Sequence, residues 1–320
     1  MKISPILLCL PLLLDLSCQA PNRETMMPPG LIIDADTGNE MDDLYAIVQA
    51  LWAKEPCVVA LTSAHFNNPQ LLTDSLWHGY PTEGIQTMAL SQQLNEMVLT
   101  GMDRLDLPHP YGCDRMVGYS WGYYEGAPVP ESPAVDFIIE QARRASPEAK
   151  LAVVILGPAT NLAAALLQAP EIAPRVHAYL LGMQYDLAHG AWNKNEFNAR
   201  NDLNALDLLL SNPDLALTVM PANVSAALTF DHAGSVARLA QYDHPAAQLL
   251  RERWAFVNAG ESWTMWDLAL VQAILHPEWA QTETVSAPPE NGARPITAYT
   301  AIAADSMEAA FWKAMDENWR

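Results

Sequence analysis

The sequence has 320 residues, of which half are hydrophobic and 17% are charged, so it can bury a large core, and its composition argues against general disorder. Lys and Arg number 17 against 37 Asp and Glu, and the formal charge of -20 argues against a nucleic-acid partner because such a chain repels phosphate. The four cysteines are too few for a disulfide scaffold and form no CxxC or Cys/His cluster, which argues against a zinc site.

The N-terminus has the features of an export signal. Lys2 precedes an apolar run over residues 6–14 that is too short to span a bilayer but suits a signal-peptide core. The following Leu-Ser-Cys18 resembles a bacterial lipobox, so a lipid on Cys18 is the one membrane attachment expected. We therefore expect a signal peptide at 1–17, a tether at 18–29 and a domain at 30–320. The protein would be exported, either periplasmic after simple cleavage or anchored as a lipoprotein.

Strand and helix patterns alternate along the rest of the chain. Apolar runs predict strands, and apolar residues at helical spacing predict helices between them. The predicted strands are 31–33, 58–61, 151–156, 176–181 and 215–220, and the predicted helices are 42–52, 161–168 and 203–210. Residues 243–276 look helical throughout, 283–285 and 296–302 predict a hairpin, and 305–319 predict a closing helix. This order indicates an α/β fold with an open, mostly parallel central sheet flanked by helices.

An acidic loop stands where the first strand ends and the first helix begins. Residues 34–43 carry five carboxylates, at Asp34, Asp36, Glu40, Asp42 and Asp43. In open α/β sheets, ligands bind outside the carboxyl ends of the strands. Crowded carboxylates raise one another's pKa unless a cation compensates them, and Ca²⁺ takes several oxygen ligands. We therefore predict a calcium site; the alternative is a helix-capping cluster in solvent.

Further motifs follow in order, at 61–67 (LTSAHFN), 156–163 (LGPATNLA), 195–202 (NEFNARND) and 266–269 (WDLA). Together with the Asp-x-Asp-x-Gly and Asp-Asp of the acidic loop, they resemble the signature of the nucleoside hydrolase family, inosine-uridine-preferring type. The resemblance covers roughly residues 30–285. This loop has two extra residues between Gly38 and Asp42, Glu40 being the conspicuous one, as in a bacterial branch of the family.

The resemblance implies calcium-dependent hydrolysis of a small-molecule nucleoside to ribose and free base. By resemblance, the metal would be held by Asp36, Asp43, Asp267 and the backbone carbonyl of Thr160, and Asp42 would be the general base. Ribose hydroxyls would be bound by Asn67, Glu196 and Asn198. Relatives commonly form dimers or tetramers, so a homo-oligomer is expected.

The leaving group is where the sequence departs from the family. Trp266 stands where the inosine-uridine type has a His that protonates the base. We expect Trp266 to stack on the base, with Trp77 or Trp121 as the second aromatic, and purines to be preferred; the alternative is that Trp266 is core packing. His65, His78 and His189 are the candidate acids, each with a structural role as the alternative.

Two other functions stay open. A haloacid-dehalogenase-type phosphatase also begins with a strand and Asp-x-Asp, but it needs Thr or Val where Gly38 stands and a later Lys, for which Lys150 is the candidate. A non-catalytic surface lipoprotein could bind a ribosyl compound through calcium. Whether Cys57 and Cys113 pair also stays open.

Overall fold

The computed structural model describes residues 30–66 and 86–320. The predictions for the signal peptide, the tether, Cys18, Asn67, Trp77 and His78 fall outside these residues. Cys57 and Cys113 are both free, so they do not pair. Among the described residues, no helix has the length and apolar character that crossing a bilayer requires.

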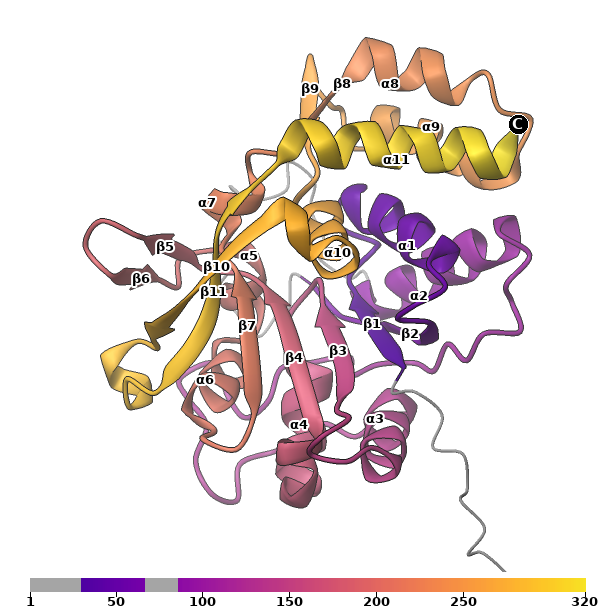
Figure 1. Ribbon diagram of the computed structural model, residues 1–320. Coiled ribbons are helices and arrows are strands. Elements are labelled where there is room, and N and C mark those ends of the chain that lie inside the picture. Colours follow the sequence, from indigo (N-terminus) through magenta and orange to yellow (C-terminus); the bar gives the residue numbers. More distant parts are fainter. Residues whose placement is uncertain (1–29, 67–85) are drawn as a thin grey trace, which may run out of the picture.

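In the described part of the chain, seven strands form one sheet in the order β10-β11-β7-β4-β3-β1-β2 (Figure 1). All neighbouring strands are parallel except β10 and β11, which form the predicted hairpin. The strands are β1 (Leu31–Ala35), β2 (Val58–Ser63), β3 (Leu151–Ile155), β4 (Val176–Leu181), β7 (Ala216–Met220), β10 (Ala280–Ser286) and β11 (Pro295–Ile302). The predicted α/β fold with a mostly parallel sheet is confirmed.

Helices cover both faces of the sheet because the inner strands are apolar on both sides. In β1, Ile33 packs with one core cluster and Ile32 with the other. The first cluster includes residues of α1 (Asp42–Trp52), α2 (Thr87–Gly101), α9 (Pro245–Phe256), α10 (Trp266–Leu275) and α11 (Ala304–Trp319). The second includes residues of α3 (Pro133–Arg144), α4 (Thr160–Gln168) and α6 (Leu203–Ser211). Figure 1 shows α10 beside α1, and α11 beyond both.

The predicted continuous helix over 243–276 is wrong. The structure has α9, then the strand β9 (Ser262–Thr264), then α10. Asn258 takes a left-handed backbone conformation with φ 52°, which ends α9, and β9 pairs with β8 (Thr229–Asp231). The described residues also include the hairpin of β5 (Gln184–Asp186) and β6 (Ala191–Asn193), the helices α5 (Phe197–Asn201), α7 (Ala222–Ser225) and α8 (His232–Leu239), and the short 3-10 helices η2 (Pro170–Arg175), η3 (Pro277–Trp279) and η4 (Pro289–Asn291).

Candidate active site

The acidic loop and the first turn of α10 meet at the carboxyl ends of the parallel strands. Asp36 follows β1, Asp42 and Asp43 begin α1, and Asp267 lies in the first turn of α10. Carboxylate oxygens of Asp42, Asp43 and Asp267 lie within 4.8 Å of one another. The backbone N–H of Asp267 donates to Asp42 Oδ2 at 3.0 Å. Carboxylates from the two ends of the sequence therefore share one site, because α10 packs beside α1.

A cavity of about 310 Å³ opens on this cluster. Its size suits a ligand as large as a nucleoside. Six of the lining residues are acidic, and two are aromatic. The full lining is Asp36, Asn39, Glu40, Asp42, Asp43, Leu156, Leu181, Gln184, Glu196, Phe197, Asn198, Ala222, Asn223, Ala226, Trp266 and Asp267.

Burial and mutual repulsion raise the pKa of the clustered carboxyls. Burial raises the pKa of Asp42 to about 6, although hydrogen bonds from the backbone of Asp267 oppose the shift. The pKa values of Asp36, Asp43 and Asp267 are also raised, first by burial and then by neighbouring carboxylates. The guanidinium of Arg253 opposes the shift at Asp43. Anionic carboxyls here need a compensating positive charge.

The donor set fits a hard divalent cation. Asp36 Oδ2, Asp43 Oδ1 and Asp267 Oδ1 are buried and accept no hydrogen bond from any described residue. A buried carboxylate oxygen without a donor is costly, and a cation that prefers oxygen ligands would satisfy all three. Of the sequence-predicted ligands, Asp43 and Asp267 belong to the group of oxygens within 4.8 Å, together with Asp42, and Asp36 lines the same cavity outside that group.

The fourth predicted ligand, Thr160, is not among the described residues that line the cavity. Its hydroxyl donates to Asp202 Oδ2 at 2.7 Å, and His65 Nε2 lies 2.8 Å from Thr160 Oγ1. The residue just after β3 that lines the cavity is Leu156, whose carbonyl accepts the amide of Asn198, another lining residue. Leu156 is four residues before Thr160. Thr160 is the first residue of α4, so it has already left the end of the strand.

Glu196 and Asn198 lie on the cavity wall beside the acidic cluster. Glu196 caps α5: its Oε1 accepts the N–H of Asn198, and its Oε2 accepts those of Met183 and Ala199, each at 3.1 Å. The Asn198 amide donates to the carbonyls of Leu156 at 2.6 Å and Leu181 at 3.3 Å. Both side chains are thus fixed by the backbone before a ligand arrives, as a sugar-binding role requires.

The lengthened acidic loop is held from two helices. Arg253 of α9, which is buried, donates to the carbonyl of Glu40 at 2.8 Å. Thr37 donates to Asn95 Oδ1 of α2 at 2.9 Å. The loop turns Asn39 and Glu40 onto the cavity wall. The charge of Glu40 signalled a role in the sequence, whereas nothing in the sequence singled out Arg253.

Two aromatic side chains, Trp266 and Phe197, line the cavity. Phe197 was missed in the sequence, although it stands inside the Glu-Phe-Asn motif. The suggested partner Trp121 is 77% exposed, stacks on Tyr119 with ring centroids 4.7 Å apart, and does not line the cavity. The suggested pairing of Trp121 with Trp266 is therefore wrong.

The two described histidines proposed as acids are also off the cavity. His65 is buried against Thr160, and burial lowers its pKa to about 4. His189 lies on the β5–β6 turn, where Nδ1 is 2.7 Å from Asp186 Oδ2. Both have structural partners, as the alternative interpretation required.

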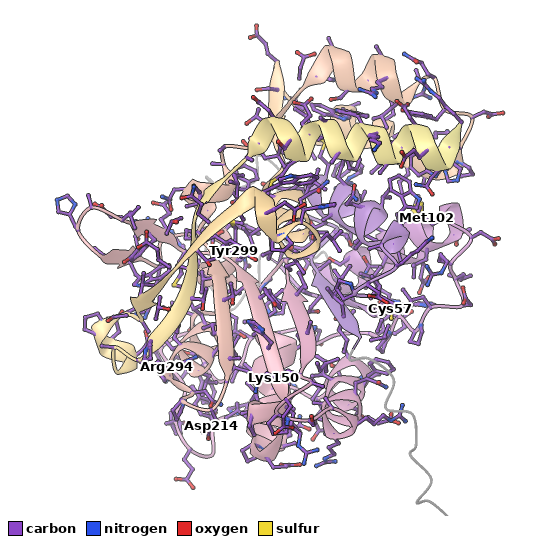
Figure 2. All side chains as sticks on the ribbon, in the orientation of Figure 1. Cys57, Met102, Lys150, Asp214, Arg294 and Tyr299 are labelled. Carbon is purple, nitrogen blue, oxygen red and sulfur yellow. The ribbon has the colours of Figure 1, made fainter. Side chains whose placement is uncertain are left out.

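Lys150, the residue that a phosphatase would need, lies at the opposite edge of the sheet. Figure 2 labels Lys150 near the start of β3, whose other end borders the cavity. Its ammonium donates to the carbonyl of Pro174. It cannot reach a group held by the acidic loop, so the haloacid-dehalogenase interpretation has no support from the fold.

Comparisons with known proteins agree with this geometry. The inosine-uridine preferring nucleoside hydrolase family matches residues 31–309. A protein of Arabidopsis thaliana named probable uridine nucleosidase 2 is 28% identical over 219 residues, 66% of each chain, and an uncharacterised protein of Schizosaccharomyces pombe is 27% identical over 203 residues, 61% of each chain. The chain thus spans slightly less than two thirds of the length of these relatives.

Solved structures share the fold. A plant nucleoside hydrolase superposes with a TM-score of 0.67 at 17% identity, covering 90% of this chain and 99% of its own. A purine-preferring ribonucleoside hydrolase from Gardnerella vaginalis superposes with a TM-score of 0.63 at 17% identity, covering 90% and 98%. Because the family match extends over most of the sequence, the chain belongs to the inosine-uridine preferring nucleoside hydrolase family.

Proposed function

We propose that the protein hydrolyses the N-glycosidic bond of a ribonucleoside with the help of Ca²⁺, giving ribose and free base. The observation that carries the proposal is the meeting of Asp42, Asp43 and Asp267 within 4.8 Å on a cavity that Glu196 and Asn198 also line. Membership of the family supports the same reaction.

Asp36, Asp43 and Asp267 would hold the Ca²⁺, with the Leu156 carbonyl in place of that of Thr160. When bound, the ion supplies a Lewis acid and a template for the sugar hydroxyls. Hydrolysis of a glycosidic bond passes through an oxocarbenium-like sugar, so water must be aimed at C1′ and deprotonated. Asp42 is the general base: its Oδ2 accepts the N–H of Asp267, which holds the carboxylate in place on the cavity wall. A positioned base contributes about 10²–10⁴-fold.

Sugar recognition falls to Glu196 and Asn198. The Asn198 amide nitrogen is engaged by two carbonyls, which leaves its oxygen to accept a ribose hydroxyl. Glu196 Oε2 already accepts two backbone N–H groups, whereas Oε1 accepts one and keeps a second lone pair for the same purpose. Asn67, outside the described residues, is proposed for a further hydroxyl on the resemblance alone.

Trp266 and Phe197 would contact the leaving base. A purine presents a larger ring system than a pyrimidine, so stacking on an indole favours purine nucleosides. We therefore propose a purine preference among the common nucleosides.

The test is an assay of purified protein with purine and pyrimidine nucleosides, with Ca²⁺ or with excess chelator. We expect reducing sugar with Ca²⁺ and none with chelator, and a loss of at least about 10²-fold in kcat for Asp42→Asn. Tight binding of ribose with no base release, unaffected by Asp42→Asn, would instead support the non-catalytic ribosyl-binding function.

Export remains part of the proposal. Residues 1–17 would direct the chain out of the cytoplasm, and Cys18 would either carry a lipid or start a periplasmic protein. Mass spectrometry of the N-terminal peptide from membrane and soluble fractions distinguishes the two, and an intact Met1 in every fraction would contradict export.

A further inference from the structure

The cavity is more acidic than a metal site alone requires. Six carboxylates line it, and none of its described lining residues is Lys, Arg or His. Asp36, Asp42, Asp43 and Asp267 have roles in the proposed function. Glu40 faces the cavity as a surplus carboxylate, close enough to Asp42, Asp43 and Glu196 for mutual repulsion.

The available positive charge does not balance this wall. One divalent ion would offset two carboxylates, and Arg253 behind the loop offsets a third. The N-termini of α1 and α10 contribute about half a charge each. With Ca²⁺ bound and all six carboxyls ionised, roughly two negative charges remain unmatched, and a neutral nucleoside brings no charge to offset them.

The residues available to the leaving group also favour a cationic ligand. A neutral base departs as an anion unless an acid protonates it, and Trp266 stands where relatives have a histidine. No described residue lining the cavity is His, Tyr, Cys or Lys. The aromatic residues present there, Trp266 and Phe197, offer ring faces that attract a cation.

We propose that this site prefers N-ribosides whose aglycone carries a fixed positive charge, of the N-ribosylpyridinium class, and that Glu40 is a residue that determines this specificity. The inference rests on the proposed hydrolysis. Water attacks C1′ and gives a proton to Asp42, while the C1′–N bond breaks and its electron pair returns to the ring nitrogen. The aglycone departs neutral, so no acid is needed, and the products are ribose, the free pyridine and one proton.

The test compares nicotinamide riboside, a fixed cation, with its neutral 1,4-dihydro form, which has nearly the same shape. Ribose release is measured with Ca²⁺ for the wild type, Glu40→Gln and Glu131→Gln. The dihydro form would have to leave as an anion, so it is measured as a competitive inhibitor, and the informative quantity is the change in the ratio of its Ki to the KM of the cation. Glu131 is exposed and outside the cavity lining, so its variant matches the change in net charge alone.

We expect Glu40→Gln to lower the preference for the cation about tenfold or more, and Glu131→Gln to leave it within about twofold. In the wild type, KM for the cation should rise more steeply with ionic strength than Ki for the neutral form, a result that does not depend on the variant folding. An unchanged preference in Glu40→Gln, or equal salt dependence for both compounds, would overturn the inference. Metal-dependent hydrolysis of neutral nucleosides would still leave the proposed function standing. Release of ribose from no N-riboside would remove both.

Discussion

Replacing Asp267 by Asn should stabilise the metal-free protein while weakening its binding of Ca²⁺. In the metal-free protein at neutral pH, Asp267 lies within 4.8 Å of two other buried carboxylates. With an effective dielectric constant of about 20, each fully ionised pair at that distance costs about 3 kcal/mol. Burial and repulsion raise the pKa of Asp267, so part of this cost is already avoided by protonation. We therefore expect the free energy of unfolding to rise by about 1–3 kcal/mol without metal.

The same variant loses a metal ligand but keeps its shape. The backbone N–H that Asp42 accepts is unaffected, and the new amide can donate to a neighbouring carboxylate. We expect the Kd for Ca²⁺, measured by titration calorimetry, to rise about 100-fold or more, which is about 3 kcal/mol of binding free energy. Urea unfolding with Ca²⁺ and with chelator gives the stability change for comparison.

Asp305→Asn is the matched control. Asp305 also lies in the first turn of a helix, α11, but it is exposed. Asp305→Asn should lower the free energy of unfolding by about 0.3–1 kcal/mol, because a carboxylate at a helix N-terminus interacts favourably with the helix dipole. It should not change Ca²⁺ binding. If metal-free Asp267→Asn were less stable than the wild type, or bound Ca²⁺ as tightly, the repulsive cluster would not be a metal site.

Three further predictions follow from the site and its supports. Burial raises the pKa values of Asp34, Asp42 and Asp202 from 3.8 to about 6. The folded metal-free protein therefore binds more protons than the unfolded chain between about pH 4 and 6. Its urea midpoint should fall as pH rises through that window, and a midpoint that rises there would contradict the shifts. Trp266→Ala should lower kcat/KM for inosine about tenfold more than for uridine, because a purine loses more stacking area; equal losses would contradict a role in stacking. Arg253→Met should reduce the free energy of unfolding by about 1–3 kcal/mol, since the acidic loop loses a charged donor to its backbone carbonyl at Glu40. A free energy of unfolding in urea equal to that of the wild type would contradict this role of Arg253.

The central part of the sheet was predictable because its inner strands are mostly buried on both faces. Residues 31–33 and 151–156 are uninterrupted apolar runs, and such runs between helical segments allow few arrangements other than a parallel sheet. The antiparallel pairing of β8 with β9 was not predictable, because it joins segments about 30 residues apart with α8 and α9 between them. The sequence of residues 243–276 predicted one helix because the segments on both sides of β9 are helical, as α9 and α10. Only the pairing with β8 makes residues 262–264 a strand.

The acidic site was predictable in its residue types and in part of its geometry. Asp36, Asp42 and Asp43 are close in the sequence, so their shared position at the strand end could be predicted. The approach of Asp267 depends on the packing of α10 against α1, which the sequence does not show. The carbonyl ligand was assigned to Thr160, and the structure instead brings Leu156 to the cavity. A backbone carbonyl leaves no mark in the residue type, so the sequence could not distinguish two positions four residues apart.

A crystal structure of the protein grown with Ca²⁺ tests the central claim most directly. The account predicts an ion with oxygen ligands from Asp36, Asp43 and Asp267 at about 2.3–2.6 Å. An occupied calcium site elsewhere, with these three carboxyls hydrogen-bonded to one another through shared protons, would contradict it.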